Sequence, residues 1–336
     1  MFSNNRIYQL LLLPIVAISM IFTSCGSPTT IDETNGSGLT KVRLQLNWFP
    51  EHEHGGFYAA KAKGYFAEEG LDVEIIPGGP KVNGIQEVVS ERVDFAIANA
   101  DQILLGRAQE ADVVALMSPM QDSPRCIMVH ESSGISKFED LKGITISLSG
   151  GKPFVAYLIK KGYLKEAQLV PFLGGIGRFL EEKDFAQQGY VFSEPIQATT
   201  HGSDPVALMV SDVGFNPYTG LLFTHGDTIR NKPELVAKVV RASVRGWQDF
   251  LADPSDTNKV ILQENEDLDE VTLTKGVDAL QPLCLPNQMP ADQIGKMASE
   301  RWQQLHDQLV EIEMLEENVD VEKAFTMKFL LPNDPK

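Results

Sequence analysis

Short strand-like segments alternate with helical ones along the chain from residue 41 onward. Apolar positions from Val42 to Trp48 alternate with polar ones, and this period of two predicts a strand over residues 41–48. Further short strands are predicted over residues 71–75, 95–98, 113–117, 127–129, 144–148, 191–192 and 206–210. Helices are predicted over residues 56–63, after the capping residue Asn83, and over residues 154–161, 178–185 and 233–254. This order of elements predicts an α/β fold.

The pattern of strand and helix restarts after Pro124, which predicts two α/β lobes. We expect the first lobe to begin with residues 41–123 and the second to comprise residues 124–213. Residues 214–336 are expected to return to the first lobe and to be mostly helical. The chain has 336 residues, of which 43% are hydrophobic, enough for two cores at roughly 100 to 200 residues per domain.

The N-terminus predicts export. One charged residue precedes position 32, and residues 10–22 form an apolar run that is shorter than the roughly 20 residues of a membrane span. The sequence from Phe22 to Gly26 resembles a bacterial lipobox, with Phe22 where that motif usually has Leu. Residues 1–24 are therefore expected to be a lipoprotein signal peptide, and Cys25 to carry lipid after cleavage. The alternative is an ordinary signal peptide with an incidental cysteine.

Residues 25–40 are expected to form a flexible tether, because Ser, Thr, Gly, Asn and Asp are frequent there. The folded part would then lie outside the cytoplasm, in the periplasm or at the cell exterior. It would touch the membrane only through its lipid.

Charge and cysteine content exclude several classes of function. There are 46 Asp and Glu against 29 Lys and Arg, a net charge of −17, which opposes binding to nucleic acid and to anionic membranes. Three cysteines are too few for a disulfide framework in this length, and Cys126 and Cys284 are expected to be buried thiols. Residues 150–153 and 174–177 fail as nucleotide-binding loops. No catalytic residue and no cofactor is predicted.

Residues 51–54 contain two glutamates and two histidines, which have metal-ligand chemistry. On an extended segment His52 and His54 could share one face, because adjacent side chains point to opposite sides. Two ligands do not make a metal site, and the other histidines lack a spacing that would complete one. We therefore expect hydrogen-bonding histidines and no metal.

The same segment is better interpreted as a ligand cradle. Trp48 ends the predicted strand, Pro50 stops its pairing, and Gly55 and Gly56 lead into a helix whose amide groups would face the crevice. Aromatic faces beside a polar histidine suit a flat heterocycle. The alternative is that Trp48 and Tyr58 are core residues.

A second candidate contact follows the strand predicted over residues 144–148. Ser149 closes that strand, and Gly150 leads into a helix that could offer amide groups to an anion. A plain strand-to-helix turn is the alternative.

Residues 48–60 and 63–73 resemble the opening of the substrate-binding lipoproteins of ABC importers, in the nitrate/sulfonate/taurine and thiamine-pyrimidine-precursor group. Further similar segments are residues 188–195, 212–218 and 233–254. The resemblance fades after about residue 260.

The resemblance implies a type II periplasmic binding protein, with two hinged lobes that close on a solute. It implies ligand contacts from the cradle, from the helix start at Asn99 and Asp101, and from Ser193 and Glu194. Glu194 could pair with an amino group or an amidine-like ring edge, or could instead hold the hinge. The predicted ligand-binding residues are Trp48, Glu51, His54, Gly55, Gly56, Tyr58, Asn99, Asp101, Ser149, Gly150, Glu194 and Tyr218.

These observations lead us to expect a monomeric, extracytoplasmic solute-binding protein that delivers its solute to an ABC permease and ATPase. A thiamine pyrimidine precursor or related nitrogen heterocycle is the expected ligand, and the lack of arginine in the cradle disfavours a strongly anionic one. Alternatives are binding of sulfonate, taurine or nitrate, or a sensory role. A pyrimidine-forming enzyme is a third alternative, although the cysteine-rich motif of the similar fungal synthases has no counterpart here.

Overall fold

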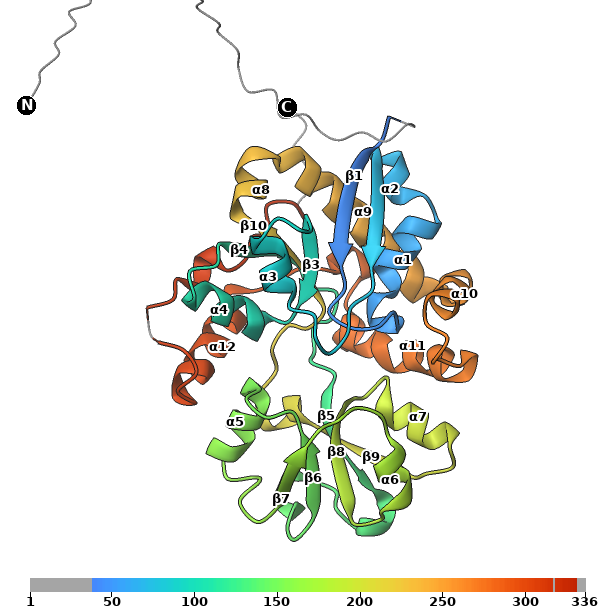
Figure 1. Ribbon diagram of the computed structural model, residues 1–336, viewed down its shortest axis with the longest axis vertical. Helices are drawn as coiled ribbons and strands as arrows, with labels where there is room; N and C mark the ends of the chain where they lie inside the picture. The colour runs from blue at the N-terminus through green and yellow to red at the C-terminus, as the bar shows by residue number, and fades with distance from the viewer. Residues whose placement is uncertain (1–37, 317, 331–336) are drawn as a thin grey trace, which may run out of the picture. The chain divides into compact units, whose positions relative to one another are not determined.

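The computed structural model describes residues 38–316 and 318–330, which form two α/β lobes (Figure 1). The expected α/β fold is thereby confirmed. The predicted signal peptide, Cys25 and the tether up to residue 37 lie outside the described residues. Among the helices that the structure describes, none is long and apolar enough to cross a membrane.

Lobe I is built on a five-stranded sheet with the order β2-β1-β3-β10-β4. Its strands are β1 (Thr40–Gln45), β2 (Leu71–Ile76), β3 (Phe95–Ala98), β4 (Val113–Met117) and β10 (Leu221–His225). β1 pairs in parallel with β2 and β3, whereas β10 lies antiparallel between β3 and β4. The helices of this lobe are α1 (Gly55–Ala62), α2 (Tyr65–Glu68), α3 (Gly84–Val89), α4 (Ala100–Ala108), α8 (Gly226–Asn231), α9 (Pro233–Ala252), α10 (Ser255–Glu264), α11 (Glu270–Cys284) and α12 (Ser299–Glu311).

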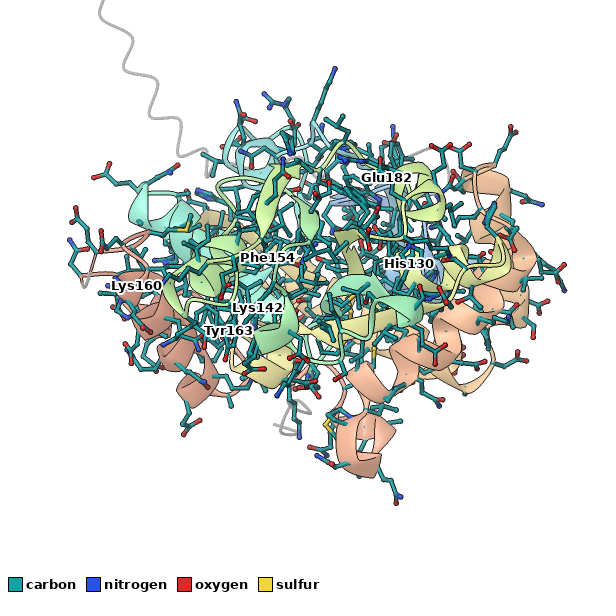
Figure 2. The ribbon with its side chains drawn as sticks, turned by 90° about the horizontal axis from the view of Figure 1, so that it is seen from below. His130, Lys142, Phe154, Lys160, Tyr163 and Glu182 are labelled. Carbon is teal, nitrogen blue, oxygen red and sulfur yellow. The ribbon has the colours of Figure 1, made fainter. Side chains whose placement is uncertain are left out.

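Lobe II is built on a second five-stranded sheet with the order β7-β6-β8-β5-β9. Its strands are β5 (Arg125–His130), β6 (Thr145–Leu148), β7 (Gln168–Pro171), β8 (Phe185–Tyr190) and β9 (Pro205–Met209), and its helices are α5 (Pro153–Lys160), α6 (Gly177–Glu181) and α7 (Glu194–Thr200). Phe154 of α5 and His130 of β5 are labelled in Figure 2. His130 is buried and stacks on Phe179 with ring centroids 3.9 Å apart.

Short single-turn 3-10 helices complete the chain. They are η1 (His52–His54), η2 (Glu131–Ser133), η3 (Phe138–Asp140), η4 (Val210–Val213), η5 (Pro286–Gln288), η6 (Ala291–Gln293) and η7 (Val321–Lys323).

Two segments connect the lobes, one between β4 and β5 and one between η4 and β10. Asn216 joins them with its side chain: its amide nitrogen donates to Asp122 Oδ1 at 2.8 Å, and its amide oxygen accepts from the Ser123 backbone at 2.7 Å. A bridge between Met120 and Thr219 also pairs the two segments. The connections are therefore tied to each other where they cross.

Several elements differ from the predicted ones. β1 ends at Gln45 instead of Trp48, because the chain bends through residues 47–51. Residues 191–192 are no strand, since β8 ends at Tyr190. The helix predicted over residues 178–185 is the single short α6, and β10 lies in the region expected to be mostly helical. The cap at Asn83 is confirmed, because its side chain accepts from the Gln86 backbone.

Candidate functional site

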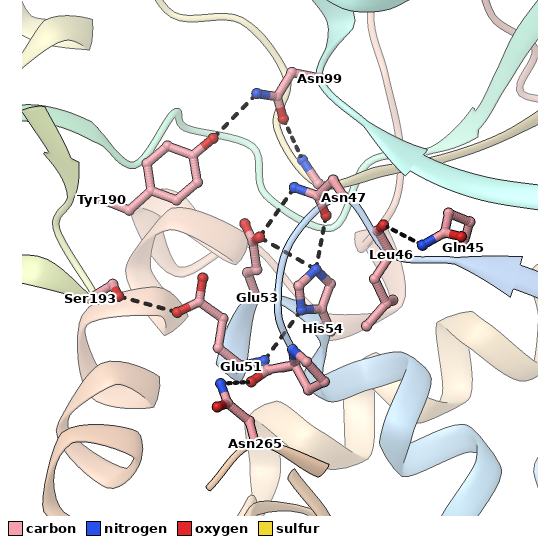
Figure 3. A network of polar contacts seen from close by, with 12 residues as sticks. Gln45, Leu46, Asn47, Glu51, Glu53, His54, Asn99, Tyr190, Ser193 and Asn265 are labelled. Atoms are coloured by element: carbon pink, nitrogen blue, oxygen red, sulfur yellow. Dashed lines mark hydrogen bonds and ion pairs between the residues drawn. The ribbon is translucent and has the colours of Figure 1, made fainter. Parts of the chain in front are cut away.

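A polar loop at the carboxyl end of β1 forms the lobe I side of the site (Figure 3). His54 Nδ1 accepts from the Glu51 backbone at 3.4 Å, and His54 Nε2 lies 2.8 Å from Asn47 Oδ1. One ring nitrogen therefore accepts and the other donates, which is the pattern of a neutral imidazole. Burial lowers the pKa of His54 to about 3. Asn47 links His54 to Glu53, because its amide nitrogen donates to Glu53 Oε1 at 3.2 Å.

The segment from His52 to His54 is a 3-10 helix, so the predicted shared face of the two histidines is wrong. His54 turns back onto its own loop, whereas His52 packs edge-on against Phe192 with centroids 4.8 Å apart. Neither ring nitrogen of His52 has a hydrogen-bond partner, and burial lowers the pKa of His52 to about 4. No three His, Cys, Asp or Glu side chains of residues 38–316 and 318–330 are grouped to hold a metal ion.

Lobe II reaches this loop through the segment after β8. Ser193 Oγ donates to Glu51 Oε2 at 3.1 Å, and Asn99 Nδ2 of lobe I donates to the Tyr190 hydroxyl at 3.2 Å. Arg125 donates to the same hydroxyl at 3.0 Å and lies over the Tyr190 ring at 4.3 Å. Side chains from both lobes thus meet in one polar network.

Phe192 belongs to the lobe II segment but packs into the core of lobe I. Its side chain is completely buried among the lobe I apolar residues. Gly276 of α11 makes room for this contact: a methyl group there would lie 2.6 Å from His52 Nε2 and 2.8 Å from Phe192 O. Such approaches are too close for a real side chain. Phe192 therefore explains why residues 191–192 leave the sheet.

The site is rich in carboxyl groups. Burial raises the pKa of Glu51, and the charges of Glu53 and Glu194 raise it further. Burial also raises the pKa of Glu53, to about 7, and the pKa values of Glu194 and Asp101. Arg125 is a cation that acts on three of these groups, lowering the pKa of Glu53, Glu194 and Asp101. The arrangement favours ligands that bring hydrogen-bond donors or positive charge.

Four predicted site residues enter this network: Glu51, His54, Asn99 and Glu194. Glu194 Oε2 accepts from the Tyr190 backbone at 2.7 Å. Asp101, at the start of α4, is half-buried and feels the charges of Arg125 and Lys152.

Gly55 and Gly56 pack closely against α9. Both are buried where α1 meets α9, and a Cβ atom would overlap the Phe250 ring at Gly55 and the Trp247 ring at Gly56. Their lack of a side chain allows this close helix packing, and ligand contact through their backbone amide groups stays a prediction. Tyr58 is 2% exposed in the same core, as the alternative interpretation stated.

The remaining predicted residues make other contacts. Tyr218 is buried against α12, and its hydroxyl accepts from the Ala298 backbone at 2.9 Å. Trp48 is half-buried and packs on Phe49, with centroids 5.4 Å apart. The Ser149 backbone donates to Gln188 Oε1 at 2.6 Å, while Gly150 has open space around it.

Sequence reasoning did not name four residues of the network as site residues: Asn47, Glu53, Arg125 and Tyr190. It named Ser193 as a ligand contact but did not foresee its hydrogen bond to Glu51. Glu53, Tyr190 and Ser193 lie inside segments that had been singled out. Arg125 had no local signal, because the sheet of lobe II brings it there by pairing with Tyr190.

Two cysteines are among the described residues. Cys126 and Cys284 are free and buried, and burial raises the pKa of both thiols.

Two binding proteins are similar to this chain along almost its whole length. The riboflavin-binding protein RibY of Chloroflexus aurantiacus is 28% identical, covering 94% of this chain and 96% of that protein. The formylaminopyrimidine-binding protein of Halalkalibacterium halodurans is 25% identical, covering 91% and 95%.

Solved structures share the fold. The periplasmic aliphatic sulphonate binding protein SsuA from Escherichia coli superposes with a TM-score of 0.66 at 14% identity, covering 88% of this chain and 95% of SsuA. The fold is that of periplasmic binding proteins. The NMT1/THI5-like family model matches residues 51–257, a span that includes η1, Arg125, Tyr190 and Glu194. The chain therefore belongs to the NMT1/THI5-like family.

Proposed function

We propose that this protein is the solute-binding component of an ABC importer and binds a small nitrogen heterocycle between its two lobes. The observation that carries the proposal is the network shared by both lobes, in which Glu51 meets Ser193 and Asn99 meets Tyr190. A ligand that contacts both sides stabilises their association, and closure is how such a protein signals loading.

The chemistry of the site supports a heterocycle with N–H groups. Glu51, Glu53 and Glu194 supply acceptors, whereas Arg125 already donates to Tyr190 and covers aromatic rings. A sulfonate or nitrate would bring a second negative charge among these carboxyl groups and would need free cationic donors. The two similar binding proteins are named for riboflavin and formylaminopyrimidine, which are also nitrogen heterocycles.

The remaining parts of the proposal concern location and partners. Cys25 carries the lipid, and an ABC permease with its ATPase receives the solute. The tether, expected over residues 25–40, ends at residue 39, because Thr40 already belongs to β1. Residues 40–123 and 214–336 form lobe I, and residues 124–213 form lobe II. The protein acts as a monomer and releases its ligand chemically unchanged, without a cofactor.

Calorimetry and thermal unfolding of the full-length chain test this proposal. The probes are 4-amino-5-hydroxymethyl-2-methylpyrimidine, formylaminopyrimidine, riboflavin, taurine, an alkanesulfonate and nitrate. A ligand at about 100 times its Kd stabilises the native state by about 2.7 kcal/mol, which is visible as a higher Tm. We expect this for a heterocycle and not for the anions. Binding of the anions alone, or conversion of a heterocycle on mass spectrometry, refutes the proposal.

A further inference from the structure

We propose that Glu53 is the specificity-determining residue of this site, and that with Tyr190 it recognises a ring edge carrying an N–H donor next to an acceptor atom. The inference rests on the function proposed above. It assigns the selection of the ligand to a residue of lobe I and names the pattern that is selected.

Glu53 has one carboxyl oxygen in use and one unused. The side chain is 1% exposed. Oε1 accepts from Asn47 Nδ2 and lies 3.3 Å from His54 Nε2, whereas Oε2 is buried with no partner. Leaving a buried polar atom without a hydrogen-bond partner is unfavourable. In Figure 3 this carboxyl group lies between His54 of lobe I and Tyr190 of lobe II.

In each of the two neighbouring carboxyl groups, one oxygen is already bound within the protein. Glu51 Oε2 accepts the Ser193 hydroxyl, and Glu194 Oε2 accepts the Tyr190 backbone N–H. Glu194 is also folded back against Gly189, where an added Cβ would lie 3.0 Å from its Oε2. Among the buried side-chain atoms of the described residues that have no hydrogen-bond partner, Glu53 Oε2 is the one carboxyl oxygen.

Tyr190 supplies the complementary donor. Its hydroxyl oxygen accepts from Asn99 and from Arg125, which occupies both lone pairs. The hydroxyl proton is therefore free to be donated. A ligand between the two side chains would give an N–H to Glu53 Oε2 and would receive the Tyr190 proton on the adjacent acceptor. An aminopyrimidine edge and an imide edge of a flavin both present this pair.

Asn47 makes the test unusually direct. Because Asn47 Nδ2 donates to the Oε1 position, a glutamine at residue 53 must place its carbonyl oxygen there. Its NH2 group then occupies the Oε2 position. Glu53→Gln therefore changes the open group from an acceptor to a donor with almost the same shape.

Protonation of the Glu53 carboxyl group should change binding in the same direction as Glu53→Gln. Burial raises the pKa of Glu53 to about 7, and with Oε1 accepting from Asn47, a proton would sit on Oε2 and make it a donor. Binding of an N–H edge should therefore strengthen as pH rises through about 7 and release a proton. The titratable and charged groups that face Glu53 are Glu51, which caps η1, His54 of η1, Arg125 of β5, Tyr190 of β8 and Glu194 of α7.

The experiment compares two probes on the full-length chain at about pH 8. The first is 4-amino-2-methylpyrimidine, and the second is 4-methoxy-2-methylpyrimidine, in which an acceptor replaces the N–H. For wild type we expect the amino probe to bind about 10- to 100-fold more tightly, the effect of one charge-assisted hydrogen bond. For Glu53→Gln we expect this preference to vanish or reverse. Glu74→Gln, on the exposed side of β2, is the matched control and should behave as wild type.

A merely structural role of Glu53 predicts another result. If Glu53→Gln weakens both probes equally, or leaves the preference intact, the inference is overturned while the proposed function stands. If wild type binds neither these probes nor any other nitrogen heterocycle, the proposed function itself fails. Proton release, measured at about pH 7 by calorimetry in buffers of different ionisation enthalpy, should be present in wild type and absent in Glu53→Gln. Equal release in both proteins also overturns the inference.

Discussion

Replacement of Phe192 by alanine should loosen the contact between the lobes and leave each lobe folded. Phe192 extends from lobe II and is completely buried in the apolar core of lobe I, against His52. Removing a phenylalanine from a single rigid core costs about 3 to 5 kcal/mol. Because Phe192 packs at the contact between the lobes, we expect the lobes to separate and water to enter the vacated space, so the loss should fall on the association of the lobes.

The magnitude follows from the buried side chain. Full burial of a phenylalanine contributes about 1.5 to 3 kcal/mol, and every 1.4 kcal/mol changes an equilibrium constant tenfold. Phe192→Ala should therefore shift the equilibrium between associated and separated lobes by about 10- to 100-fold. The radius of gyration from small-angle X-ray scattering should increase without ligand, and ligand affinity should fall by a similar factor.

A control variant separates the two effects. Phe179 is an equally buried phenylalanine within lobe II, stacked on His130. Phe179→Ala should lower the free energy of unfolding by about 3 to 5 kcal/mol with unchanged scattering of the folded protein. If Phe192→Ala behaves in the same way as Phe179→Ala, the idea that Phe192 fastens the lobes is wrong.

Three further predictions test the site and its support. Gly56→Ala should destabilise the protein by about 1 to 3 kcal/mol or more in urea unfolding, because the added Cβ overlaps Trp247. Gly150→Ala is the control and should be nearly neutral, because Gly150 has open space around it. Equal effects of the two substitutions would contradict the packing argument. Burial lowers the pKa of His52 to about 4 from an ordinary 6.5, so the unfolded state binds more protons than the native state between these pH values. Wild type should therefore lose stability relative to His52→Gln as pH falls from about 6.5 to 4. Parallel profiles of unfolding free energy against pH would refute this. Glu194→Gln should weaken the binding of 4-amino-2-methylpyrimidine by about 1 to 3 kcal/mol in calorimetry, and an unchanged affinity would remove Glu194 from the site.

Local sequence patterns predicted most elements of the fold, because period and capping are local properties. The two-lobe α/β organisation, the Asn83 cap and the long amphipathic α9 all follow from residues close together in the chain. β10 was missed for the opposite reason. It is a five-residue strand inserted antiparallel between β3 and β4 after the chain has crossed back from lobe II. No pattern within Leu221–His225 indicates those partners.

The sequence predicted single residues of the candidate site, but not which residues they contact. Glu51 and Glu194 were named, but their environment depends on Ser193 and on Arg125, which long-range pairing brings close. Gly55 illustrates a different limit. The sequence shows a residue without a side chain, and it cannot tell whether the space is left for a ligand or for a helix such as α9.

The bonds of Asn216 to Asp122 and Ser123 limit how one lobe can travel against the other. If the two connecting segments were independent, each could extend or shift separately, and the lobes could then translate as well as rotate relative to each other. Because the Asn216 side chain and the bridge between Met120 and Thr219 join the two connecting segments, these segments must bend together. Motion that keeps these hydrogen bonds is therefore restricted to rotation of the lobes about a hinge axis near Asn216. The distance of each binding residue from this axis sets how far that residue moves.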